Sequence, residues 1–141
     1  MNFICFRISG QGINLNELST VLGMVPQYSH TRGDIYYDKI TKQAGTYSDD
    51  YWIASVEIND VNETEKRIEA LVDSLYRNKE YVQQTSRVHA ATLWVTVYQD
   101  VIQHNLHFSK NVLAKISELD IDLDITCMQL QEFYRGTNVW S

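Results

Sequence analysis

Proline, cysteine and long apolar runs are scarce in this sequence. Its 141 residues include one proline, Pro26, and two cysteines, Cys5 and Cys127. Both cysteines lie in apolar, strand-like runs, so we expect small buried side chains in a reducing cytosol, with a disulfide or a reactive thiol as the alternative. No apolar run approaches the roughly 20 residues of a membrane-spanning helix, and the N-terminus lacks the basic start and apolar run of a signal peptide. We therefore expect a soluble, cytoplasmic protein with no membrane partner.

Basic residues are also fewer than acidic residues. The chain has 12 Lys and Arg residues against 18 Asp and Glu residues, which gives a net charge of -6. This balance argues against nonspecific nucleic-acid binding, which needs clustered Lys and Arg, and favours a basic protein partner. No basic residue lies between Lys115 and Arg135, a stretch that contains the acidic residues Glu118, Asp120, Asp122, Asp124 and Glu132. This acidic run is either a solvated face or a patch that contacts a partner.

The remaining composition is that of a folded domain. Apolar residues make up 44% of the chain and charged residues 21%, so global disorder is not expected. A chain of 141 residues can bury a core without metal ions or disulfides, and no low-complexity tract or linker divides it. We expect residues 1–141 to form a single domain.

Residues 3–34 carry the densest pattern of structural signals. Apolar residues alternate over residues 3–8 and a Ser-Gly-Gln-Gly sequence follows, which predicts a strand and then a sharp turn. Asn14, with Glu17 three positions later, suits a capping box, and leucines follow at helical spacing. Gly23 is suited to the end of this helix, and Pro26 prevents its continuation.

Residues 27–50 have little helical periodicity and are rich in tyrosine. Residues 35–37 could form a short strand and residues 43–46 a turn, which together predict an irregular hairpin. Long segments of this kind are often functional, and tyrosine with arginine is typical of recognition surfaces. The candidate partner-binding residues are Tyr28, His30, Arg32, Tyr36, Tyr37 and Tyr47, together with the acidic residues Asp120, Asp122, Asp124 and Glu132. The alternative is that the tyrosines cover the core.

Further strands are predicted by apolar alternation or β-branched content over residues 51–58, 92–99 and 121–127. A helix begins at Asp60 or Asn62 and carries an apolar stripe to Tyr76, and Ser109 can cap another helix. Residues 106–109 could pair as a short strand. This order predicts an α+β sandwich, a largely antiparallel sheet with helices packed on one face.

The sequence shows no catalytic signature. It has no phosphate-binding P-loop and no GxSxG nucleophile turn. His30, Arg32 and Asp34 could converge as an acid–base set, but no nucleophile accompanies them. Three aspartates of the acidic run match the first ligands of a calcium loop, but Ile125 stands where glycine is required and Gln131 where glutamate is required. We therefore expect no metal site, no cofactor and no enzyme activity.

Several motifs together resemble a known family. They are Phe6–Gly10 at the end of a strand, Val21–Pro26 at the end of a helix, His30–Asp34, Trp52 in a strand, and Leu119–Asp122. This pattern is similar to that of a bacterial domain-of-unknown-function family, DUF4279, over most of the chain up to Leu130. The resemblance implies an α+β fold and no established catalytic residues. Some small acidic bacterial proteins of this kind serve as immunity proteins beside secreted toxins, and the resemblance implies such a role here.

The resulting functional hypothesis is an immunity protein. It would bind a cognate bacterial toxin domain, a basic nuclease being one candidate, and occlude its active site by charge and shape. The alternative is a small-ligand-binding or regulatory module that uses the tyrosine-rich segment, with His30 and Arg32 as its polar groups.

Overall fold

A computed structural model describes residues 2–99 and 106–129 of the chain. Within these ranges the strands are β1 (Asn2–Gly10), β2 (Tyr28–His30), β3 (Ile35–Tyr37), β4 (Ala44–Thr46), β5 (Asp50–Ile58), β6 (Ala90–Gln99) and β7 (Asp122–Gln129). The helices are α1 (Leu15–Leu22), α2 (Thr64–Tyr76), α3 (Lys79–Val88) and α4 (Lys110–Leu119), with a 3-10 helix, η1 (Val61–Glu63), before α2. No helix in the described ranges is long and apolar enough to cross a membrane.

Five strands form one sheet in the order β2-β5-β1-β6-β7. All neighbours in it are antiparallel except β6 and β7, which run parallel because α4 lies between them in the chain. The remaining strands, β3 and β4, pair with each other as a separate hairpin. The predicted α+β architecture with a largely antiparallel sheet is therefore confirmed, and the parallel pair is an addition to it.

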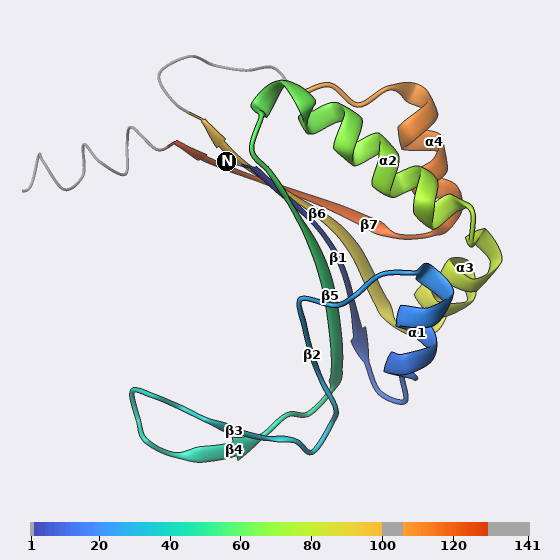
Figure 1. Cartoon of the computed structure of the whole chain (residues 1–141). Coiled ribbons are helices and arrows are strands. Elements are labelled where there is room, and N and C mark those ends of the chain that lie inside the picture. The colour runs from blue at the N-terminus through green and yellow to red at the C-terminus, as the bar shows by residue number, and fades with distance from the viewer. Residues whose placement is uncertain (1, 100–105, 130–141) are drawn as a thin grey trace, which may run out of the picture.

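The helices all lie on one side of the sheet (Figure 1). The apolar alternation of β1 explains this, because Ile4, Phe6 and Ile8 point to the helix side and are buried. Trp52 of β5 is also fully buried, and its indole Nε1 donates a hydrogen bond to Ser19 Oγ of α1 at 2.9 Å. This contact attaches the short α1 to the sheet.

Local helix signals behave as predicted. Asn14 Oδ1 accepts a hydrogen bond from Glu17 N, and Ser109 Oγ accepts one from Val112 N, so both residues cap helices. Gly23 ends α1 in the left-handed conformation with φ 63°.

Three segments differ from the sequence prediction. Residues 43–46 were predicted as a turn, but residues 44–46 form strand β4, which pairs with β3. Helix α3 was not predicted, because its residues are mostly polar and Val82 is the one that becomes buried. Side chains of α3 hold it to the end of α4, since Gln83 Nε2 donates to Glu118 O and Ser86 Oγ donates to Leu119 O. The predicted strand at residues 106–109 is wrong, because this segment has no regular secondary structure and joins no sheet.

The cysteines are both free, but only one has the predicted environment. Cys5 is half-buried in the central strand and its Sγ lies 3.3 Å from Ser55 Oγ. Cys127 is exposed, contrary to the prediction of burial. Ile121 before β7 is buried whereas Ile125 is 45% exposed, so the helices cover only the beginning of this edge strand.

The side of the sheet opposite the helices is here called the open face, since no helix of the described ranges covers it (Figure 1). The strand register places on it the odd-numbered residues of β1 and β5 and the even-numbered residues of β2, β6 and β7. The sheet is curved, and the β3–β4 hairpin projects from its edge on this same side (Figure 1).

Candidate binding surface on the open face

One edge of the open face is formed by stacked aromatic rings, here called the aromatic corner: Tyr28, His30, Tyr36, Tyr47 and Tyr51. The imidazole of His30 stacks on Tyr47 with ring centroids 3.5 Å apart and on Tyr51 with centroids 5.4 Å apart. Tyr28 meets His30 edge-on at 5.4 Å, and Tyr36 lies 4.8 Å from Tyr47. Aromatic rings at these separations attract one another more strongly than their buried area alone accounts for. Contacts among its own rings therefore stabilise the aromatic corner.

Hydrogen bonds tie the same rings together. The Tyr28 hydroxyl lies 2.8 Å from His30 Nδ1 and 2.9 Å from the Tyr47 hydroxyl. The Tyr47 hydrogen bond, followed by partial desolvation, raises the pKa of Tyr28 to about 12. Tyr28 therefore keeps its proton throughout the neutral range.

The predicted acid–base set does not assemble. Arg32 Nη1 donates to Gln11 Oε1 at 3.2 Å, whereas Asp34 Oδ2 accepts from Thr31 N at 2.8 Å. His30 contacts the tyrosines instead of either of these residues. The possibility that His30, Arg32 and Asp34 converge is therefore not met, because each has a different partner.

Asp50 connects three segments at this edge, although it was not among the residues predicted from the sequence. Its Oδ2 accepts hydrogen bonds from Gly12 N and Ile13 N, and its Oδ1 accepts one from Arg32 N, all at 2.7–2.9 Å. These amide donors lower the pKa of the buried Asp50 carboxyl. A single acidic residue at the start of a strand carries no local signal of this role, because its partners come from distant segments.

The β3–β4 hairpin separates the two tyrosines that were predicted together. Tyr36 lies over Gly45, its partner in the opposite strand, and a Cβ on Gly45 would come within 2.6 Å of the phenol ring. Tyr37 points to the other side of the hairpin and is 70% exposed. Tyr36 thus belongs to the aromatic corner, whereas Tyr37 stands outside it.

The opposite edge of the open face is acidic. Asp122 and Asp124 of β7 are exposed there, and Asp124 Oδ2 lies 3.9 Å from Arg7 Nη2 of the central strand. The Arg7 guanidinium also lies over the Trp94 ring at 5.6 Å. Asp120 is exposed at the end of α4 in the left-handed conformation with φ 61°, outside the sheet. Glu132 lies outside the described residues.

The two groups of predicted partner-binding residues do not form one cluster. The aromatic corner is at β2 and the aspartates are at β7, which are separated by four strand-to-strand steps. At about 4.8 Å for each step, the two edges are about 19 Å apart. Between them the open face carries Arg7 and Trp94, so a partner that touches both edges must span the sheet.

Residues 2–130 match a family model described as Domain of unknown function (DUF4279). The chain belongs to this family. No curated protein and no solved structure matches it.

The motifs that identify this DUF4279 protein lie at fold-determining positions. Gly10 leaves β1 where His89 packs closely, since a Cβ there would lie 2.5 Å from His89 Nδ1. Gly23 ends α1, and Trp52 fills the core between α1 and the sheet. Gly10, Gly23 and Trp52 therefore account for turns and packing of the family fold, and they mark no functional surface.

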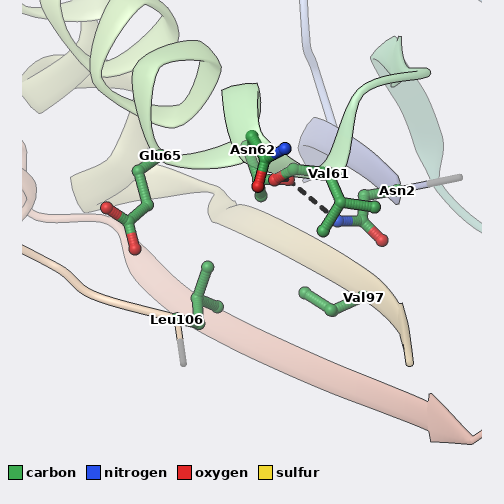
Figure 2. A pocket seen from close by; sticks show the side chains of 7 residues that line it. Asn2, Val61, Asn62, Glu65, Val97 and Leu106 are labelled. Carbon is green, nitrogen blue, oxygen red and sulfur yellow. Dashed lines mark hydrogen bonds between the residues drawn. The ribbon is translucent and has the colours of Figure 1, made fainter. Parts of the chain in front are cut away.

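The DUF4279 protein also has a pocket of about 170 Å³ beside η1, lined in part by Asn2, Thr64, Glu65 and Leu106 (Figure 2). Asn2 is buried, donates to Thr64 Oγ1 and accepts from Tyr98 N. Glu65 Oε1 accepts from His107 N. Since these polar groups already have partners, the pocket gives no support to the alternative prediction of a small-ligand module. Among the described residues, no group of three or more His, Cys, Asp or Glu side chains could hold a metal ion.

Proposed function

We propose that this DUF4279 protein is a cytoplasmic immunity protein that binds a cognate bacterial toxin domain and blocks its active site, without catalysing a reaction itself. The observation that carries the proposal is the open face. Over the described residues it is a broad sheet surface without a covering helix, with aromatic side chains at one edge and carboxylates at the other.

The aromatic corner suits protein recognition. Tyrosine and tryptophan are enriched at the centres of interfaces, because each buries a large area while retaining a polar atom. Here the rings are already packed against one another, so little side-chain freedom is lost when a partner covers them. Trp94 in the middle of the face is also held in place, here by a hydrogen bond that its Nε1 donates to Thr126 Oγ1 at 3.0 Å.

Charge favours a basic partner such as a nuclease domain, whose substrate groove must attract phosphates. The net charge of the chain is -6, and the exposed carboxylates of Glu57, Asp122 and Asp124, which contribute to it, lie on the open face. Opposite charges of this kind accelerate association and orient the two proteins before contact. An immunity protein that must capture a toxin quickly would benefit from this steering.

The test of this function is binding to a purified toxin domain encoded beside this gene. We expect a stoichiometric complex and loss of the toxin's activity, measured by calorimetry and by an activity assay. A neighbouring product that is no toxin, together with no binding, would contradict the proposal.

The acidic edge is tested separately by charge reversal. Asp122→Lys with Asp124→Lys should slow association by about tenfold at low salt, and the difference should shrink as salt screens the charges. The matched control is Glu69→Lys with Glu80→Lys, which changes the net charge equally on exposed helical positions. Asp120 is left intact, because its positive φ makes Lys there a strained substitution. Equal association rates for both pairs would remove the acidic edge from the proposal.

A further inference from the structure

We infer that the β3–β4 hairpin is the part of this protein that enters the partner's cleft and reaches its carboxylate-lined catalytic centre. This inference rests on the proposed function and deepens it, since it assigns the blocking step to one element. Four observations support it: the hairpin projects, its base is braced, its tip is closed by hydrogen bonds, and its exposed side chains are apolar and basic.

The hairpin extends away from the five-stranded sheet on the side of the open face (Figure 1). It pairs only within itself, as a separate two-stranded sheet. An isolated hairpin of this length is marginally stable in water, so its shape must be maintained from its base or by a partner.

The base of the hairpin is braced by the aromatic corner. Tyr47, directly after β4, stacks on His30 and contacts Tyr28 through its hydroxyl. The backbone continues the pairing there, since Gly33 N donates to Tyr47 O and Tyr47 N donates to Asp34 O. The stacked rings therefore fix the direction in which the hairpin leaves the body.

The tip is closed by its own hydrogen bonds. Asp38 Oδ1 accepts from Ile40 N at 2.8 Å and from Thr41 N at 3.3 Å, and these amides lower the pKa of the Asp38 carboxyl. Asp38 N donates to Gln43 O, and Lys42 N donates to Asp38 O. A loop held in one conformation before binding loses less entropy when it enters a cleft.

The exposed side chains of the hairpin include apolar residues along its length and basic residues at its tip. Ile35, near the base, is 75% exposed and Ile40, at the tip, is 92% exposed, and Tyr37 lies on the same side of the hairpin as Ile35. Lys39 and Lys42 are exposed at the tip, where Asp38 is the one carboxylate of residues 38–43, and its hydrogen bonds with backbone amides keep it ionised. Two positive charges and one negative charge therefore give the tip a net charge of +1 on an acidic protein.

This chemistry matches a cleft with apolar walls and an anionic floor. The catalytic centre of a metal-dependent nuclease is such a floor, because carboxylates bind its divalent cations. Its surrounding substrate groove is basic, which suits the acidic edge of the open face. The two charge patterns of this protein thus correspond to two different parts of one partner.

The inference is tested with the toxin domain encoded by the adjacent gene. Lys39→Glu with Lys42→Glu, and separately Ile35→Ser with Ile40→Ser, should each weaken binding at least about tenfold. The matched control, Lys66→Glu with Lys110→Glu, changes exposed helical positions and should leave affinity within about twofold. Thermal unfolding should be nearly unchanged in all three, since every altered residue is exposed and Lys42, at φ 57°, is replaced by another unbranched side chain.

A second measurement locates the hairpin on the toxin. Replacing a metal-binding carboxylate of the toxin by alanine should weaken binding of the wild-type chain but have little further effect on the Lys39→Glu, Lys42→Glu variant. If the wild-type chain binds no toxin, the proposed function fails. If it binds and the hairpin variants bind and inhibit equally well, the hairpin inference alone is overturned.

Discussion

Asp50 shows how one buried carboxylate can define the shape of a surface. Its two oxygens accept hydrogen bonds from the β1–α1 turn and from the segment after β2, while the residue itself begins β5. Asn in its place would retain one acceptor and would turn an amide donor toward at least one of the three backbone donors.

Asp50→Asn should lower the free energy of unfolding by about 2–3 kcal/mol, because part-buried backbone amides would lose the charged acceptor that they share. Chemical denaturation would measure this, with the exposed neighbour Asp49→Asn as a control expected within about 0.5 kcal/mol. The pKa of Asp50 is lowered from its usual 3.8, so its contribution is present above that pH and is lost as the pH falls through the lowered value. The difference between wild type and variant should therefore shrink in strong acid, and a constant difference would contradict this account.

Tyr28 provides a second test at the residue scale. Its pKa of about 12 depends first on the hydrogen bond with Tyr47, so Tyr47→Phe should lower it toward 10. A raised phenol pKa means that the stabilisation is complete below pH 10 and is lost as the pH rises through 12. NMR titration of the tyrosine ring carbons would follow this, and Tyr37→Phe serves as the control because Tyr37 lies outside the corner. An unchanged Tyr28 titration in Tyr47→Phe would show that this hydrogen bond does not form.

Among the elements, α1 depends on one polar contact across the core. Two turns of helix bury only Leu18 and Leu22 completely, so the hydrogen bond from Trp52 to Ser19 has a large share in positioning it. The indole is otherwise surrounded by apolar side chains.

Ser19→Ala should therefore destabilise the protein by about 1–3 kcal/mol, since the indole N–H would remain buried without a partner. Thr20→Ala is the matched control, because Thr20 is exposed and its hydroxyl donates only to Asn16 O within the same helix. Thermal unfolding of both variants would measure the difference. Equal melting temperatures would show that Trp52 does not need Ser19.

A substitution in the β3–β4 hairpin should loosen the hairpin without destabilising the hydrophobic core. Gly45→Ala places a Cβ within 2.6 Å of the Tyr36 ring, so the ring must leave its position against Gly45 and Tyr47. We expect faster hydrogen exchange at the hairpin amides, with little change in the global melting temperature. Thr46→Ala is the control, because Thr46 is exposed in the same strand. Exchange rates like those of wild type would contradict the packing of Tyr36 over Gly45.

At the scale of the whole molecule, the two sides of the sheet differ in what covers them and in their side chains. One side is filled by helices and is the hydrophobic core, and the other carries charged and aromatic residues without a helix over it in the described ranges. The two free cysteines lie on opposite sides by register, Cys5 on the open face and Cys127 on the helix side of β7.

Because the two cysteines lie on opposite sides of the sheet, their thiol-labelling rates can show which side the partner covers. In single-cysteine variants, Cys127→Ser and Cys5→Ser, the toxin domain should slow thiol labelling of Cys5 at least about tenfold and leave Cys127 unaffected. Measurement of the labelling rate with and without the toxin would show which face is covered. Protection of Cys127 alone would place the interface on the other side and contradict the use of the open face.

Much of the fold was determined by local sequence. Alternation in β1 and β5 and the caps at Asn14 and Ser109 act within a few residues, so strands and helices could be predicted from them. Helix α3 escaped prediction because its stability comes from contacts with α4 that its own polar sequence does not show. The parallel pairing of β6 with β7 likewise depends on the path of the intervening segment.

Only part of the candidate binding surface could be predicted from the sequence. Its residue types marked tyrosines and aspartates as binding residues, but strand order alone put Tyr28 and His30 at one edge and Asp124 at the other. The stacking of His30 on Tyr47, 17 positions later, and the three amide contacts of Asp50 likewise arise from long-range pairing. Local periodicity selects the face that a side chain occupies, whereas its neighbours on that face are selected by which strands pair, and only the tertiary structure decides that.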